Sequence, residues 1–286
     1  MKISFITDEF TQSLDEAIAF ALEHALQGVE LRSVDNRPIH DFSLDEVAEW
    51  KKKLDAAGLK VSNLSGSFNK CDRIPALMKA ELEKLEKLCQ IAEILECNTI
   101  RGFTFFRTGE QWAPAEEIAP LFVPAGKILQ RHKKMLILEA DPSVNTTNHA
   151  ALANVLALLD GSCFGAVYDP GNCLYDPKRE HPFPDGYEAV KPYLQHIHIK
   201  DAVYLENGEP LCLAPGQGLV GYNELLKRLK ADGYNGWLSL EPHYRKDTIL
   251  TEEQMRTPSG DDFSRGGKEA MQESVEALVG MLNQLN

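Results

Sequence analysis

The stretch Gln195-His196-Ile197-His198-Ile199-Lys200-Asp201 alternates strictly between polar and apolar side chains. A period of two residues is typical of a β-strand whose two faces meet different surroundings. Ile197 and Ile199 share one face. The other face carries His196, His198 and Lys200. An exposed edge strand would also alternate, but two histidines and a lysine together favour a strand whose polar face lines a chemical site.

This strand is the seventh in a pattern of strand followed by helix that repeats along the chain. The helices begin at capping-box signatures such as Ser13-Leu14-Asp15-Glu16 and Ser43-Leu44-Asp45-Glu46, or carry leucines at helical spacing. The predicted strands cover residues 2–7, 28–32, 59–64, 98–103, 135–139, 164–169, 195–201 and 236–241. Eight such units in 286 residues predict an α/β fold, a single (β/α)8 TIM barrel. No linker or change of composition divides residues 1–286, which we expect to form one domain.

The connections between these elements differ in length. Returns from helix to strand are short, as at residues 56–58, whereas several segments after strands are long, as at residues 201–219 and 242–267. In a TIM barrel the active site is built from the loops at the carboxyl ends of the strands. The sequence therefore predicts a site at that rim.

Four polar residues mark the carboxyl ends of the last four strands: Glu139, Asp169, His198 and Glu241. Each has another interpretation when taken alone, because Glu139 could be a cap or surface charge, Asp169 part of a turn, and His198 a core residue. Together, crowded carboxylates and an imidazole need a compensating charge. A divalent cation supplies it, and the oxygen-rich set favours Mn²⁺ or Mg²⁺, with Zn²⁺ or Co²⁺ as alternatives.

Composition limits the partners. The net charge of −13 disfavours nucleic acid, and the densest basic run, Lys51-Lys52-Lys53, is interpreted as the solvated face of a helix. No apolar run is long enough to span a bilayer, and the N-terminus turns acidic too early for a signal peptide. Six scattered cysteines without a Cys-x-x-Cys pair indicate reduced thiols. We therefore expect a cytoplasmic protein with a small-molecule substrate and neither a membrane nor a nucleic-acid partner.

Five short motifs carry a family resemblance: 138–139 (Leu-Glu), 168–172 (Tyr-Asp-Pro-Gly-Asn), 196–201 (His-Ile-His-Ile-Lys-Asp), 215–218 (Pro-Gly-Gln-Gly) and 240–243 (Leu-Glu-Pro-His). In this order they resemble the xylose isomerase-like TIM-barrel superfamily, in its sugar isomerase and epimerase branch, which is related to AP endonuclease family 2. The resemblance implies that Glu139, Asp169, His198 and Glu241 bind one metal ion. It also implies that Glu139 and Glu241 are the acid/base pair acting on a small sugar, sugar phosphate or hydroxy-keto compound, in a homodimer or homotetramer.

The predicted substrate contacts are Arg101, Asn172, His196 and Lys200. Arg101 and Lys200 could clamp a carboxylate or phosphate. An internal salt bridge from Arg101 to Glu30 or another acid is the alternative. His196, deeper in the strand than His198, could instead orient its neighbours.

Three other functions stay open at this point. A dehydratase acting on 3-dehydroshikimate or an inosose would share the ligands and explain Arg101 and Lys200, although Asp141 and Asn172 stand where that group has histidines. An AP endonuclease-like hydrolase would need further histidines, which are missing from 65–67 and 103–106. A non-catalytic sugar-binding barrel could keep the same ligands without turnover.

Overall fold

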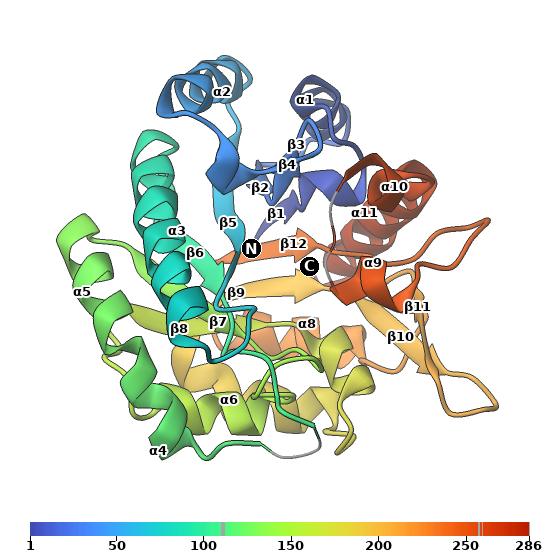
Figure 1. Ribbon diagram of the computed structural model, residues 1–286. Helices are drawn as coiled ribbons and strands as arrows, with labels where there is room; N and C mark the ends of the chain where they lie inside the picture. Colours follow the sequence, from blue (N-terminus) through green and yellow to red (C-terminus); the bar gives the residue numbers. More distant parts are fainter. Residues whose placement is uncertain (110–111, 257, 259, 286) are drawn as a thin grey trace.

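Eight parallel strands form a barrel in the computed structural model, which describes residues 1–109, 112–256, 258 and 260–285 (Figure 1). In spatial order they are β1 (Lys2–Phe5), β12 (Trp237–Leu240), β9 (Leu194–Ile199), β8 (Phe164–Tyr168), β7 (Met135–Glu139), β6 (Thr99–Gly102), β5 (Lys60–Phe68) and β2 (Gly28–Leu31). A parallel bridge between Ile6 and Glu30 brings β1 next to β2 and nearly closes the ring. The predicted (β/α)8 barrel is therefore confirmed.

Helices surround the strands, as the ring of coiled ribbons in Figure 1 shows. The longer ones are α1 (Leu14–Glu23), α2 (Leu44–Ala56), α3 (Pro75–Ile94), α5 (Val123–His132), α6 (His149–Leu156), α8 (Tyr222–Ala231) and α11 (Gly267–Asn283). Shorter helices are α4 (Ala115–Ile118), α7 (Tyr187–Val190), α9 (Glu252–Arg256) and α10 (Gly260–Ser264). Each predicted helix has a counterpart, and α9 and α10 lie in the long segment after β12.

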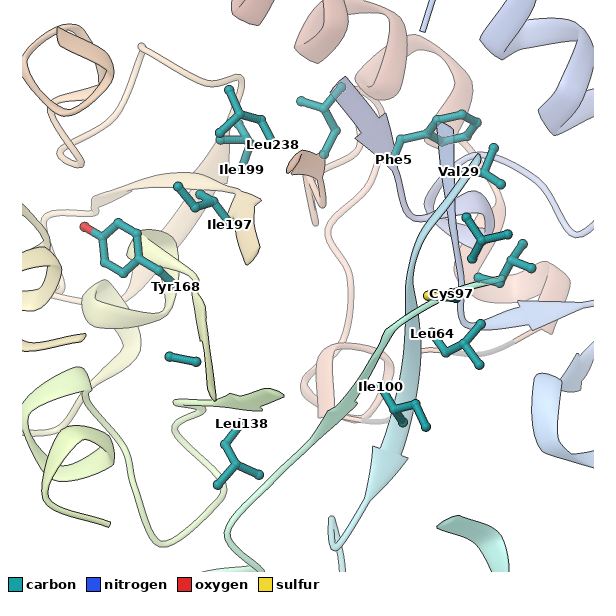
Figure 2. Packing of buried hydrophobic residues seen from close by; sticks show 14 of the residues in the cluster. Phe5, Val29, Leu64, Cys97, Ile100, Leu138, Tyr168, Ile197, Ile199 and Leu238 are labelled. Carbon is teal, nitrogen blue, oxygen red and sulfur yellow. The ribbon is translucent and has the colours of Figure 1, made fainter. Parts of the chain in front are cut away.

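The apolar core lies between the strands and these helices. Figure 2 labels buried members of it from every strand of the barrel: Phe5, Val29, Leu64, Ile100, Leu138, Tyr168, Ile197, Ile199 and Leu238. Ile197 and Ile199 belong to this core, while His196 and His198, which alternate with them along the strand, make polar contacts. The alternation of the seventh strand thus separates the core from the barrel interior, as its sequence predicts.

The two predicted capping boxes differ in outcome. At α2 the box is complete, because the Ser43 hydroxyl accepts from Glu46 N and the Glu46 carboxylate accepts from Ser43 N. At α1 the Ser13 hydroxyl accepts from Glu16 N, but the Glu16 carboxylate accepts from the Thr11 hydroxyl at 3.0 Å. Ser13 N donates to the Thr11 hydroxyl at 3.1 Å, so Thr11 stands between the backbone donor and the carboxylate that the motif predicts to meet.

Two small hairpins at the carboxyl ends of the strands are additions to the predicted pattern. One is β3 (Ser33–Val34) with β4 (Arg37–Pro38), and the other is β10 (Asp201–Tyr204) with β11 (Pro210–Leu213). The predicted strand 195–201 therefore ends at Ile199, and Asp201 begins the second hairpin. Asp169 and Glu241 directly follow their strands instead of ending them. These shifts of one or two residues leave the site at the predicted rim.

Two further observations concern the chain as a whole. All six cysteines are free thiols, as predicted. Among the described helices, none combines the length and the apolar character that crossing a bilayer requires.

Candidate metal centre and active-site cavity

The four predicted ligands converge in the barrel interior. Glu139, Asp169, His198 and Glu241 each offer one ligand atom, and these atoms all lie within 4.8 Å of one another. Every one of the four side chains is at most 3 % exposed. Three carboxylates and one imidazole at this spacing suit a divalent cation, because such an ion offsets their mutual repulsion and their loss of hydration. The residues present therefore fit a metal site.

His198 lies at the centre of this group. Its Nδ1 is 3.2 Å from Glu139 Oε1 and 3.0 Å from Glu241 Oε2. Its Nε2 is 3.2 Å from Glu30 Oε1 on the opposite side of the ring. Burial lowers the pKa of His198, but Glu30, Glu139 and Glu241 outweigh that effect and hold the pKa well above its usual range. Glu30 thus fixes the ring so that Nδ1 faces the other ligands.

Among the four predicted ligands, Asp169 is the one whose pKa lies nearest to neutral pH. It caps the short helix η4 (Pro170–Tyr175), since its Oδ1 accepts from Asn172 N. Its Oδ2 lies 2.7 Å from Lys200 Nζ. Burial raises the pKa of Asp169 to about 6 against the opposing effect of Lys200, and the charges of Glu139 and Glu241 raise it further.

Glu139 is held by two of the predicted substrate contacts. Arg101 Nη1 donates to Glu139 Oε2 at 2.9 Å, and Asn172 Nδ2 donates to Glu139 Oε1 at 3.3 Å. Burial opposes ionisation, but Arg101 and His198 lower the pKa of Glu139 below its ordinary value. The salt bridge of Arg101 is therefore made to a predicted ligand, and Arg101 also lines the cavity above it.

His196 lies beneath the site. Its Nε2 is 2.8 Å from Glu30 Oε2, and the side chain is 1 % exposed. The cavity lining among the described residues includes Arg101, Asn172 and Lys200 but not His196. The position of His196 supports the interpretation in which it orients Glu30, and through it His198, while the other three remain candidates for substrate contact.

Sequence reasoning missed Arg32, which holds Glu241. Arg32 Nη1 donates to Glu241 Oε1 at 2.7 Å, and the same guanidinium contacts Asp8 at 3.0 Å and Glu9 at 2.8 Å. Burial opposes ionisation of Glu241, but Lys200, His198 and His243 outweigh it and hold its pKa well below the usual range. Arg32 directly follows β2, so the rule that identified the four ligands could have found it.

A cavity of about 740 Å³ opens above this group. Its buried floor consists of Arg32, Arg101, Glu139, Asn172, Lys200 and Glu241. Residues from the loops after β5, β6, β7 and β8, from the β10–β11 hairpin and from the segment after β12 form its walls. Of the four ligands, Glu139 and Glu241 face this space, whereas Asp169 and His198 are not among its described lining residues. The arrangement leaves two carboxylates available to a bound molecule.

The family model of the xylose isomerase-like TIM barrel matches residues 18–278. The chain belongs to the xylose isomerase-like TIM-barrel family. Sequence comparison with curated proteins gives no match. The resemblance to this family, inferred from the five motifs, is therefore confirmed.

Solved structures show the same fold at low sequence identity. The IOLI protein with a bound zinc atom is 18 % identical with a TM-score of 0.74, covering 100 % of this chain and 99 % of that chain. The probable 3-DHS dehydratase AsbF from Bacillus anthracis is 18 % identical with a TM-score of 0.72, covering 98 % and 99 %. D-psicose 3-epimerase from Clostridium cellulolyticum H10 is 14 % identical with a TM-score of 0.74, covering 100 % of both chains.

Proposed function

We propose that the protein is a metal-dependent isomerase or epimerase acting on a small sugar, sugar phosphate or hydroxy-keto compound by proton transfer. One observation carries the proposal: Glu139 and Glu241 both line the cavity and lie 3.2 Å and 3.0 Å from His198 Nδ1, while His198 and Asp169 are not among the described lining residues. Two carboxylates that reach one bound molecule are what removal and return of a proton require. The solved epimerase of the same fold supports this class.

Glu139, Asp169, His198 and Glu241 would hold the metal ion. When bound, a divalent cation supplies Lewis-acid stabilisation of negative charge that develops on oxygen beside a carbon losing its proton. Three carboxylate ligands favour Mn²⁺ or Mg²⁺, while the zinc atom of the IOLI structure keeps Zn²⁺ among the candidates, with Co²⁺.

The remaining chemistry belongs to the side chains. Glu139 and Glu241 are ionised at neutral pH, because their pKa values lie below the ordinary value. One carboxylate removes a proton from carbon next to a carbonyl and, once protonated, can return it to the neighbouring carbon. For delivery to the opposite face, the other carboxylate first takes a proton from solvent and then donates it. Arg101 and Asn172 orient Glu139, and Arg32 and Lys200 orient Glu241, so each base is held from two directions.

A dehydratase is the second candidate. Arg101 and Lys200 both line the cavity floor and are cations that a keto acid would contact, and AsbF shares the fold. Proton removal by the same carboxylates would then be followed by loss of a hydroxyl group as water.

Solvent exchange distinguishes the two candidates. Metal-loaded protein is incubated in D₂O with ketoses, 3-dehydroshikimate and an inosose, and the products are followed by NMR and mass spectrometry. We expect deuterium at the carbon next to the carbonyl, an isomerised or epimerised product, and loss of both in the Glu241→Gln variant. Loss of water from the substrate would support the dehydratase, and the absence of exchange with every compound would contradict both.

A further inference from the structure

Three arginines at the cavity mouth have no acidic partner among the side chains that the structure describes. Arg107 comes from the segment after β6, Arg179 from the loop after β8, and Arg256 ends α9. All three line the cavity that Glu139 and Glu241 face. Arg179 and Arg256 are exposed and Arg107 is half-buried. Within the described residues, no carboxylate oxygen lies within 4 Å of any of the three guanidinium groups.

Unlike the three arginines at the mouth, the cations of the cavity floor have acidic partners. Arg101 and Lys200 lie 2.9 Å from Glu139 and 2.7 Å from Asp169. Arg32 contacts three acids, as described above. The charges of the floor cations are therefore offset by neighbouring carboxylates, and those at the mouth are not.

Local contacts orient the mouth arginines without occupying all of their donors. The Arg179 guanidinium lies 4.7 Å from the centroid of the Tyr204 ring, and that of Arg256 lies 4.4 Å from the centroid of Phe106. Arg107 donates one bond, to the Gly109 carbonyl at 3.3 Å. A guanidinium stacked on a ring keeps its N–H edge free, and that edge matches the oxygens of carboxylate and phosphate.

The acidic residues of the cavity wall do not cancel this charge. Asp141 is paired with Lys70 at 2.9 Å. Asp176 accepts from two neutral side-chain donors, Thr147 at 2.7 Å and Asn148 at 3.2 Å, and keeps its charge. With Glu209 on the turn of the β10–β11 hairpin, it sets two negative charges against three positive ones. In a chain with a net charge of −13, a positive mouth attracts anions to this one opening.

We propose that the substrate carries an anionic group, a phosphate ester or a carboxylate, which the arginines at the mouth bind while the reacting carbons lie at the floor. This assignment rests on the proposed function for the part of the substrate that reacts. It adds that the opposite end of the substrate is negatively charged. A cavity of about 740 Å³ has room for a molecule that touches both regions.

Calorimetric titration tests the assignment without relying on turnover. Metal-loaded protein is titrated with inorganic phosphate, a ketohexose 6-phosphate, a ketohexuronate and the neutral ketohexose. The variants are the triple change Arg107→Gln, Arg179→Gln and Arg256→Gln, and the control Arg73→Gln. Arg73 suits the control because it is exposed and lies before α3, outside the cavity lining.

We expect the anionic sugars to bind at least about tenfold more tightly than the neutral one, because their charged group accepts charge-assisted hydrogen bonds from the arginines. The triple variant should lose this preference and keep the affinity for the neutral sugar, and Arg73→Gln should change neither. Preference for the phosphate or for the uronate identifies which anion the substrate carries. Equal binding of charged and neutral sugars, or anion binding that survives the triple change, would overturn the assignment.

These experiments test the anion site and the proposed proton transfer independently of each other. If Glu241→Gln leaves turnover intact while the triple variant loses anion preference, the proposed proton transfer is wrong and the anion site stands. If turnover behaves as proposed but the mouth arginines do not affect binding, the anion site is wrong and the proposed function stands.

Discussion

Arg32 Nη1 lies 2.7 Å from Glu241 Oε1, although the two residues stand 209 positions apart in the chain. The contact connects the end of β2 with the end of β12, so the same guanidinium that holds Asp8 and Glu9 also holds a predicted base. We expect Arg32→Gln to lower the free energy of unfolding by about 3–5 kcal/mol, because it leaves buried carboxylates without their counter-charge. Chemical denaturation measures this loss. A variant as stable as the parent would show that the contact is not structural.

The pKa of Asp169 predicts how metal binding depends on pH. This pKa is raised to about 6, so the folded protein holds a proton on Asp169 below pH 6 that the metal ion must displace. Metal affinity should therefore be at least about tenfold weaker at pH 5 than at pH 7, with one more proton released at the lower pH, because His198, whose pKa is held well above its usual range, gives up its proton at both pH values. Titration of metal-free protein with Mn²⁺ at both pH values measures the ratio. Equal affinities would mean that Asp169 is already ionised at pH 5 or is not a ligand.

The stability of the metal-free protein depends on pH in the opposite direction from metal affinity. A carboxyl whose pKa is raised on folding stabilises the fold most at low pH, and the contribution is lost as pH rises from about 4 to 6. Metal binding and stability thus change in opposite directions over the same pH range, which separates this group from carboxylates with lowered pKa values, such as Glu139.

Glu30 is expected to control metal affinity without touching the ion. It accepts from His196 at 2.8 Å, from His198 at 3.2 Å and from Asn63 at 2.8 Å. Glu30→Gln should weaken metal binding by about 10–100-fold, the usual effect of losing a partner that orients a histidine ligand. Glu49→Gln, an exposed change on α2, is the control. Unchanged metal affinity in Glu30→Gln would show that Glu30 and His196 do not orient His198 for metal binding.

The loop after the β10–β11 hairpin predicts a contrast between two glycines. A Cβ at Gly218 would lie 2.2 Å from Asp201 Oδ1 and 2.5 Å from the Ala202 carbonyl, while one at Gly161 would meet nothing within 4 Å. Asp201 accepts from Gly216 N and Gly218 N, so the clash disturbs the whole turn. Gly218→Ala should therefore cost about 1–3 kcal/mol and Gly161→Ala almost nothing, by thermal unfolding. Equal stabilities of the two variants would contradict this description of the loop.

The sequence predicted the strands and the four converging residues because both depend on local patterns. Alternation and helical spacing repeat every few residues, and His198 and Glu139 occupy the same place in their own units. Boundaries were less accurate at Asp201, because a polar residue after an alternating run can continue the strand or begin a turn.

Contacts between distant loops could not be predicted in the same way. Arg32 has three acidic partners in two separate parts of the chain, and no local pattern indicates which residue it will meet. The arginines at the mouth, which have no acidic partner in the described part of the chain, are a property of the folded cavity, since each comes from a different segment. The Glu16 contact with Thr11 also depends on how the chain enters α1.

The most direct test of the central claim is anomalous X-ray scattering from crystals grown with Mn²⁺. The account predicts a peak bound by the carboxylates of Glu139, Asp169 and Glu241 and by Nδ1 of His198, with Lys200 displaced from Asp169. Three other described groups also bring possible ligand atoms together: Glu30 with His196 and His198, His149 with Cys173 and Glu180, and Glu9 with Glu241 and His243. Manganese bound at any of those three groups, and not at the site of the four predicted ligands, would contradict the account.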